Sequence, residues 1–281
     1  MTPGDLTRDT AVTPLPAAPG WYTASLPDAW SYVTPSGGVL MTVALQAIRA
    51  EVGDPGMHPV SATTLFCSPV PAGPLEIRVE TIRKGGAAMQ LRAALSSTTL
   101  PGPGLEVSAT FSRVRQGPEV TDLCLPDLPH PDVARRLSGP RRDGRPTFPF
   151  FENFDGRHAI GHDFGEQGWL PTDARFARWF RYLTPVTLPD GTLDPLAIPP
   201  IADTMPPALL QKLGPDHPRF HAPSLDLTVH FLQPTRSSWL LVDARARCAR
   251  AGYASASVDV WGDDGSLVAF GTQTMFLRSR R

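Results

Sequence analysis

The segment TLFCSPVPAGPLEIRVETIRKGGAAMQLRAALSSTTLPGPGLEVSATFSRVR (64–115) decides the fold expected for this chain. Its piece LEIRVE (75–80) alternates apolar and polar residues, which is the period-two pattern of a half-buried strand. The alternation returns in LRAAL (91–95) and in LEVSATF (105–111), and the turn sequence PGPG (101–104) stands between these two pieces. The segment therefore predicts antiparallel strands joined by hairpins.

A second segment repeats this pattern, LTVHFLQPTRSSWLLVDARARCARAGYASASVDVWGDDGSLVAFGTQTMFLRSR (227–280). It also contains a turn sequence, GDDG (262–265), between two strand-like pieces. The offset is 165 residues (231 minus 66), and it holds within a few residues along the segment: Phe66-x-x-Pro69 matches Phe231-x-x-Pro234, Gly86 matches Gly252, and Leu105 matches Leu267. We therefore expect two copies of one unit.

Each copy has a helix candidate before its strands. GGVLMTVALQAIRAEVG (37–53) places apolar residues on one stripe and ends at Gly53, which suits a helix C-cap. The second copy offers MPPALLQKLG (205–214), in which the prolines suit a first helical turn. The predicted organisation is a first repeat (1–115), a linker rich in Pro, Gly and Arg (116–146) and a second repeat (147–281).

Composition excludes several function classes. The 26 basic and 27 acidic residues leave a net charge of −1, so no basic field is available to attract nucleic acid. Cys67, Cys124 and Cys248 are too scattered for a disulfide framework or a zinc site, which favours a reducing, cytoplasmic location. No apolar run reaches the length of about 18 residues that a membrane span needs. No Walker loop or G-x-G-x-x-G is present, so no nucleotide cofactor is expected.

One charge stands alone in the stretch IPPIADTMPPALL (198–210). Asp203 is the only charged residue between positions 195 and 211, and burying a carboxylate among apolar residues is costly unless something compensates it. Two interpretations remain open at this point. Asp203 is either an N-cap of the following helix or a group placed there for chemistry.

The order and spacing of these pieces resemble the double-hotdog acyl-CoA thioesterases, that is, the type II acyl-CoA thioesterases and their relatives. The resemblance implies an α+β double hotdog: two tandem hotdog repeats, each a long central helix wrapped by an antiparallel sheet. It also implies hydrolysis of fatty acyl-CoA thioesters to free acid and CoA. The pieces that carry it are SGGVLMTVALQAIRAEV, FCSPVPAGPLEIRVETIRKGGAAMQLRAAL, LEVSATFSRVR, IADTMPPALL, SLDLTVHFLQP and GYASASVDVWGDDGSLVAFGTQTMFLR.

The same resemblance implies the site residues. The catalytic set is Asp203 at the start of the second central helix, Ser224 in PSLDLTVHF and Gln273 in FGTQTMFLR, which together hold the attacking water. Serine stands here where better-known members carry threonine. The thioester carbonyl is expected near a central-helix N-terminus, where Gly37 and Gly38 allow close approach of the substrate. No cofactor and no metal are expected.

Other interpretations compete with this one. Asp226 is a reserve base, and the four-residue histidine spacings in HAIGHD (158–163) and HPRFH (217–221) are weak metal signals. WFRYL (179–183) predicts a strand at the interface between the repeats, with CoA phosphate binding as the alternative. The competing functions are a non-catalytic acyl-binding hotdog protein and a hotdog hydratase or dehydratase. A homodimer or higher homo-oligomer is expected, since sheet edges would close across two such units.

Overall fold

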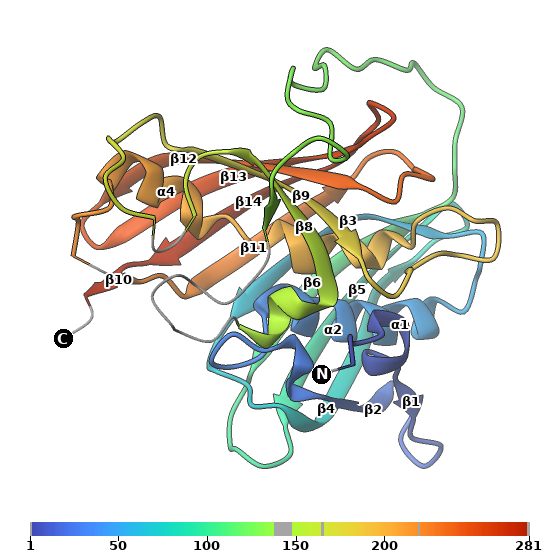
Figure 1. Cartoon of the computed structure of the whole chain (residues 1–281). Helices are drawn as coiled ribbons and strands as arrows, with labels where there is room; N and C mark the ends of the chain where they lie inside the picture. Colours follow the sequence, from blue (N-terminus) through green and yellow to red (C-terminus); the bar gives the residue numbers. More distant parts are fainter. Residues whose placement is uncertain (1, 138–147, 164–165, 219, 280–281) are drawn as a thin grey trace.

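The structure is a computed structural model that describes residues 2–137, 148–163, 166–218 and 220–279. In this part of the chain, thirteen strands form one antiparallel sheet (Figure 1). A separate two-stranded sheet pairs β10 (Phe220–His221) with β15 (Arg278–Ser279). Neighbouring strands of the large sheet follow the order β1-β2-β4-β5-β6-β3-β11-β14-β13-β12-β9-β8-β7.

The first half contributes one long helix and a meander. The helical elements are α1 (Leu6–Asp9), a 3-10 turn η1 (Asp28–Trp30) and α2 (Gly37–Val52). The strands are β1 (Thr13–Pro14), β2 (Trp21–Leu26), β3 (His58–Phe66), β4 (Gly73–Lys84), β5 (Ala88–Ser97) and β6 (Leu105–Ser112).

The second half repeats the meander with shorter helices. The helical elements are η2 (Pro149–Asn153), η3 (Pro195–Ala197), α3 (Ile198–Ala202) and α4 (Pro206–Leu213). The strands of the large sheet are β7 (Arg136–Leu137), β8 (Phe154–Ile160), β9 (Arg175–Tyr182), β11 (Ser224–Phe231), β12 (Leu240–Arg250), β13 (Tyr253–Gly262) and β14 (Leu267–Phe276).

The predicted internal repeat is visible as a two-fold arrangement of the strands. β3 and β11 pair at the middle of the sheet, and the strands on either side follow the matching orders β6-β5-β4 and β14-β13-β12. Thr63 lies directly opposite Thr228, and these two residues are separated by the same 165 positions that the sequence comparison gave. The approximate two-fold axis therefore passes between this pair.

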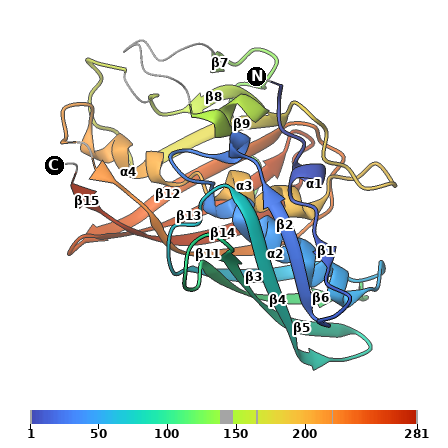
Figure 2. The ribbon, with the colours of Figure 1, turned by 90° about the horizontal axis from the view of Figure 1, so that it is seen from below.

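The strands of the first half curve around α2 (Figure 2). As expected, α2 ends at Gly53, which adopts a left-handed conformation (φ 62°). Eleven of the sixteen residues of the helix are buried, including the polar Thr42, because the sheet covers it on one side and α3 contacts it on another. The strand residues predicted to face inward, such as Ile77, Leu91 and Val107, are buried in the same core.

In the described part of the second half, no helix is as long as the central helix that the resemblance implied. The helical segment of this half is split into α3 and α4, with Asp203, Thr204 and Met205 between them. Pro206 causes the break, because proline has no N–H to donate to a carbonyl in the preceding turn. The expectation of two equivalent long helices is therefore wrong for this half.

The WFRYL sequence forms part of β9, which is a strand as predicted, but it does not lie between the repeats. β9 pairs with β8 and β12, on the far side of the second half from the β3–β11 junction. Trp179 instead packs in a second apolar cluster under residues 125–128, and its indole N–H donates to the Pro129 carbonyl (3.1 Å). The predicted linker thus covers this face, while its residues 138–146 lie outside the described residues.

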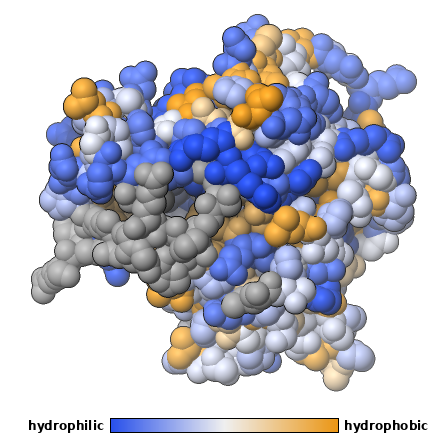
Figure 3. All heavy atoms as spheres, in the orientation of Figure 1, coloured by the Kyte–Doolittle hydropathy of each residue, from blue (hydrophilic) through white to orange (hydrophobic). Residues whose placement is uncertain are grey.

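The exposed surface carries mainly polar residues. On the face seen in Figure 3, hydrophobic residues form small separate groups between hydrophilic ones. Of the helices in the described part of the chain, none has the length and apolar character needed to cross a membrane.

Candidate active site

The break between α3 and α4 positions Asp203. Asp203 is the C-cap of α3, and its backbone N–H donates to the Pro199 carbonyl (3.1 Å). The N-cap of α4 is Met205, two residues further on. The predicted place of Asp203, at the start of the second central helix, is therefore corrected: it follows one short helix and precedes another.

The Asp203 carboxylate joins the two halves of the molecule. Its Oδ2 accepts a hydrogen bond from the Gly38 backbone N–H (2.9 Å) and a longer one from the Ser36 hydroxyl (3.4 Å). These donors belong to the N-terminus of α2, where free N–H groups and the helix dipole favour a negative charge. Asp203 therefore does act at a helix N-terminus, but at that of the other half.

The second carboxylate oxygen faces the other two predicted residues. Asp203 Oδ1 accepts from the Ser224 hydroxyl (3.1 Å) and from the Gln273 Nε2 (2.5 Å), and Gln273 Nε2 also lies 2.7 Å from the Ser224 Oγ. Ser224 begins β11 and Gln273 lies on the neighbouring β14. The three residues that the resemblance selected form one closed triangle of hydrogen bonds.

Two features of this triangle suit it to hold a water molecule. Gln273 Oε1 is buried and has no hydrogen-bond partner among the described residues. A buried acceptor without a donor is costly, and a bound water would satisfy it. Burial also raises the pKa of Asp203 to about 6, against the opposing effect of its hydrogen bonds to Gly38, Ser224, Gln273 and Ser36. A carboxylate with such a pKa can accept a proton near neutral pH.

Gly37 and Gly38 have different roles in the structure. A Cβ on Gly38 would lie 2.1 Å from the Pro199 carbonyl oxygen, so α2 and α3 approach closely only because this residue has no side chain. Its N–H is occupied by Asp203. The Gly37 N–H has no acceptor among the described residues, and a Cβ on Gly37 would lie 3.0 Å from Asp203 Oδ2. Of the two glycines predicted to bind substrate, Gly37 is therefore the one whose N–H is available to a substrate oxygen.

Further contacts fix α2 against the helical segment of the second half. The Thr42 hydroxyl donates to the Leu196 carbonyl (2.9 Å), and Arg49 forms an ion pair with the buried Asp194 (2.9 Å). These contacts follow the helix axis away from Gly38. They hold the N-terminus of α2 in a defined position relative to Asp203.

Asp226 and the histidine pairs lie outside the triangle. Asp226 accepts a hydrogen bond from the Thr274 backbone N–H (2.9 Å), beside the register shift that separates it from Ser224. His162 contacts Glu166 (3.0 Å) and stacks on Trp169. In the ranges that the structure describes, no group of three or more His, Cys, Asp or Glu side chains is arranged to hold a metal ion.

The sequence reasoning missed two residues, Tyr32 and Arg178, of which Tyr32 lies near enough to Asp203 for the carboxylate charge to affect it. Tyr32 lies in the loop before α2, and the charges of Asp203 and Arg178 both affect its pKa, which burial raises well above the usual range. Arg178 lies on β9, and burial lowers the pKa of its guanidinium. An arginine among the aromatic residues of RFARWFRY (175–182) was the available signal, since a buried cation needs compensation.

Comparisons with known proteins agree with the fold. The sequence model of the acyl-CoA thioesterase N-terminal domain matches residues 26–114, and that of the C-terminal domain matches residues 127–277. No curated protein sequence is significantly similar to the chain.

Similar solved structures come from several bacteria. A hot dog fold protein from Alicyclobacillus acidocaldarius has a TM-score of 0.81 and 22% identity, with 98% of each chain covered. The acyl-CoA thioesterase II TesB2 from Mycobacterium marinum has a TM-score of 0.75 and 23% identity, covering 98% of this chain and 99% of that one. A tesB protein from Mycobacterium avium subspecies paratuberculosis has a TM-score of 0.72 and 18% identity, with 97% of each covered. These similarities show the hotdog fold, and the two domain matches show that the chain belongs to the acyl-CoA thioesterase family.

Proposed function

We propose that this chain is a double-hotdog acyl-CoA thioesterase, which hydrolyses acyl-CoA to a carboxylic acid and free CoA. The observation that carries the proposal is the buried triangle of Asp203, Ser224 and Gln273 at the N-terminus of α2. Family membership supports thioester hydrolysis as the type of reaction.

The proposed chemistry uses water as the nucleophile. Asp203 removes a proton from a water held by the Ser224 hydroxyl and the free Gln273 Oε1, and the water oxygen attacks the thioester carbonyl carbon. Negative charge develops on the carbonyl oxygen. When the C–S bond breaks, the thiolate leaves and takes back the proton from Asp203. A thioester is reactive enough that this route needs no covalent intermediate.

The raised pKa of Asp203 fits this role. A base with a pKa of about 6 is mostly ionised at neutral pH and still basic enough to accept the proton of a water under attack. The N-terminus of α2 holds the carboxylate in place, and the Gly37 N–H there is free to donate to substrate.

The experiment is thiol release from acyl-CoAs of increasing chain length by the wild type and by Asp203→Asn. We expect the substitution to lower kcat by about 10³-fold or more, since general-base catalysis alone contributes about 10² to 10⁴. Asp226→Asn is the matched control, because Asp226 is a neighbouring carboxylate that accepts its hydrogen bond from the Thr274 backbone in β14. It should retain kcat within about threefold.

Other outcomes would point to the competing functions. Acyl-CoA binding without any turnover by the wild type would make the chain an acyl-binding protein. Addition of water to an enoyl-CoA, with no thiol released, would make it a hydratase. Equal losses of kcat in Asp203→Asn and Asp226→Asn would show that Asp203 is not the catalytic base.

A further inference from the structure

Arg178 is a buried cation with unused hydrogen-bond donors. Its surroundings are aromatic: the guanidinium carbon lies 5.0 Å from the ring centroid of Phe151 in η2, and 5.3 and 5.7 Å from those of Phe176 and Phe180 on β9. Its side chain is 14% exposed, and its Nε is buried without a hydrogen-bond partner among the described residues. A buried N–H donor without an acceptor is unfavourable unless a water or a ligand accepts its hydrogen bond.

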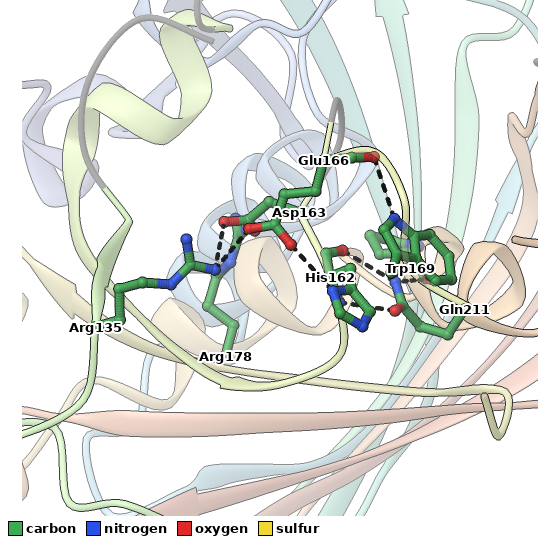
Figure 4. A network of polar contacts seen from close by, with 8 residues as sticks. Arg135, His162, Asp163, Glu166, Trp169, Arg178 and Gln211 are labelled. Atoms are coloured by element: carbon green, nitrogen blue, oxygen red, sulfur yellow. Dashed lines mark hydrogen bonds and ion pairs between the residues drawn. The ribbon is translucent and has the colours of Figure 1, made fainter. Parts of the chain in front are cut away.

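The charge of Arg178 is already balanced. Its Nη2 lies 3.2 Å from Asp163 Oδ1, and Asp163 also faces Arg135, which in turn lies 2.8 Å from Glu166 (Figure 4). Two arginines thus face two carboxylates. An additional full negative charge is not needed at this place, so the free donors suit an uncharged oxygen or one that becomes charged only transiently.

Tyr32 brings a second free donor to the same place. Its ring packs edge-on against Phe151 (5.6 Å between centroids), and Phe151 is one of the rings that also face Arg178. The Tyr32 hydroxyl has no hydrogen-bond partner within the described ranges, although both Asp203 and Arg178 are near enough for their charges to affect it. Tyr32 belongs to the same loop as Ser36, which contacts Asp203 Oδ2.

The usual donor of a hotdog site is partly occupied here. Of the first N–H groups of α2, that of Gly38 donates to Asp203, and those of Val39 and Leu40 donate to the Ser36 carbonyl. Only the Gly37 N–H is left to stabilise negative charge on a substrate oxygen. The site therefore needs a further donor. The Tyr32 hydroxyl lies on the loop that carries Ser36, and Arg178 faces the same Phe151 ring as Tyr32, so these two free donors are the candidates.

We propose that Tyr32 and Arg178 bind the carbonyl oxygen of the thioester, with the Tyr32 hydroxyl donating a hydrogen bond and the guanidinium stabilising the charge that develops. This inference rests on the proposed function. It assigns two substrate-binding residues, one from each half of the chain. The donors act on the oxygen only, so bond making and breaking proceed as described above.

The test separates contact with the carbonyl from support of the loop. Arg178→Met removes the guanidinium, whereas the matched control Asp163→Asn breaks the same ion pair and keeps the guanidinium. We expect Arg178→Met to lower kcat by about 10² to 10³-fold, the usual loss for one oxyanion donor, and Asp163→Asn to change it by less than about fivefold. Tyr32→Phe should resemble Arg178→Met, with the exposed Tyr253→Phe as its control.

Binding of two inert CoA analogues provides a readout that does not require turnover. One analogue is a ketone in which a methylene replaces the thioester sulfur, and the other is an S-alkyl-CoA in which a methylene replaces the carbonyl. Calorimetric titration of the wild type should favour the ketone, and Arg178→Met or Tyr32→Phe should weaken the ketone about tenfold while leaving the S-alkyl-CoA unchanged. If Arg178→Met fails to fold, Arg178→Lys, which keeps charge but not the planar fork, takes its place.

Each result has a distinct meaning. Equal effects of Arg178→Met and Asp163→Asn, or equal weakening of both analogues, would overturn the proposed contact. Failure of the wild type to hydrolyse any thioester would instead overturn the proposed function. A preference for the ketone would still report on the carbonyl contact in that case.

Discussion

The two halves of this molecule share a strand arrangement but differ at the positions that do chemistry. The offset of 165 residues carries Asp203 onto Gly38 and Ser224 onto Pro59. On the last pair of strands, Gln273 lies opposite Leu227, and the corresponding pair in the first half is Ala109 opposite Ala62. The carboxylate, hydroxyl and amide of the second half therefore correspond to residues without a reactive side chain: Gly38, Pro59 and Ala109.

This difference shows a division of labour between the copies. The first half retains one continuous helix, whose N-terminus requires glycine and donates to Asp203. In the second half the helical segment is interrupted before Pro206. At this break the Asp203 carboxylate faces the N-terminus of α2. The second half thus supplies the Asp203 carboxylate, and the first half supplies the Gly38 N–H that donates to it. A single triangle per chain follows from this arrangement.

Gly38→Ala tests the close approach of the two helical segments and should have the largest effect on stability. The new Cβ would meet the Pro199 backbone at 2.1 Å, so one helix must shift. We expect the free energy of unfolding to fall by more than about 3 kcal/mol, and thiol release to fall with it because Asp203 loses its Gly38 contact. Gly86→Ala, which meets no atom within 4 Å, is the control. Denaturant unfolding that ranks the two variants equally would contradict the close approach.

The ionisation of Asp203 should have the next largest effect. Its pKa in the folded chain is about 6, above the ordinary value of 3.8, so folding favours the protonated form. The stability associated with this group is fully present below the lower pKa and is lost as the pH rises through 6. Relative to Asp203→Asn, the wild type should therefore lose up to about 3 kcal/mol between about pH 4 and pH 8.

The activity should follow the opposite direction across the same pH range. The ionised carboxylate is the base, so kcat/KM should rise with pH and level off above the pKa of Asp203. Parallel unfolding and rate measurements at each pH check both trends. A rate that stays flat through pH 6 would show that another group governs the proton transfer.

The fold was largely predictable because its signals are local. Alternation within β4, β5 and β6 and the turn residues between them depend on neighbours in the sequence, and the 165-residue repeat follows from comparing the sequence with itself. The triangle of Asp203, Ser224 and Gln273 was found only through a family resemblance, since each residue alone has a more ordinary explanation. The hydrogen bonds now show that they converge.

The features that sequence reasoning missed depend on contacts between distant segments. Asp203 was expected at the start of its own helix, but its backbone donor is Gly38, 165 residues away. The free donors of Tyr32 and Arg178 are meaningful only once Phe151 brings the two together. Pro206 was interpreted as a favourable first-turn residue, which is correct for α4, but the same proline also ended the preceding helix.

The junction of the two halves should show the smallest effect and the closest symmetry. Thr63 and Thr228 face each other across β3 and β11, with their hydroxyl oxygens 2.9 Å apart. Thr63→Val and Thr228→Val keep the β-branched shape and lose this hydrogen bond, so each should lower the free energy of unfolding by about 0.5 kcal/mol. The double variant should cost no more than about the same amount, because the bond can be lost only once. Urea unfolding of the three variants measures this, and clearly unequal single effects would mean that the asymmetry of the helices extends to the strands. Equal effects would confine it to the helical side, where the broken helix and Gly38 account for it.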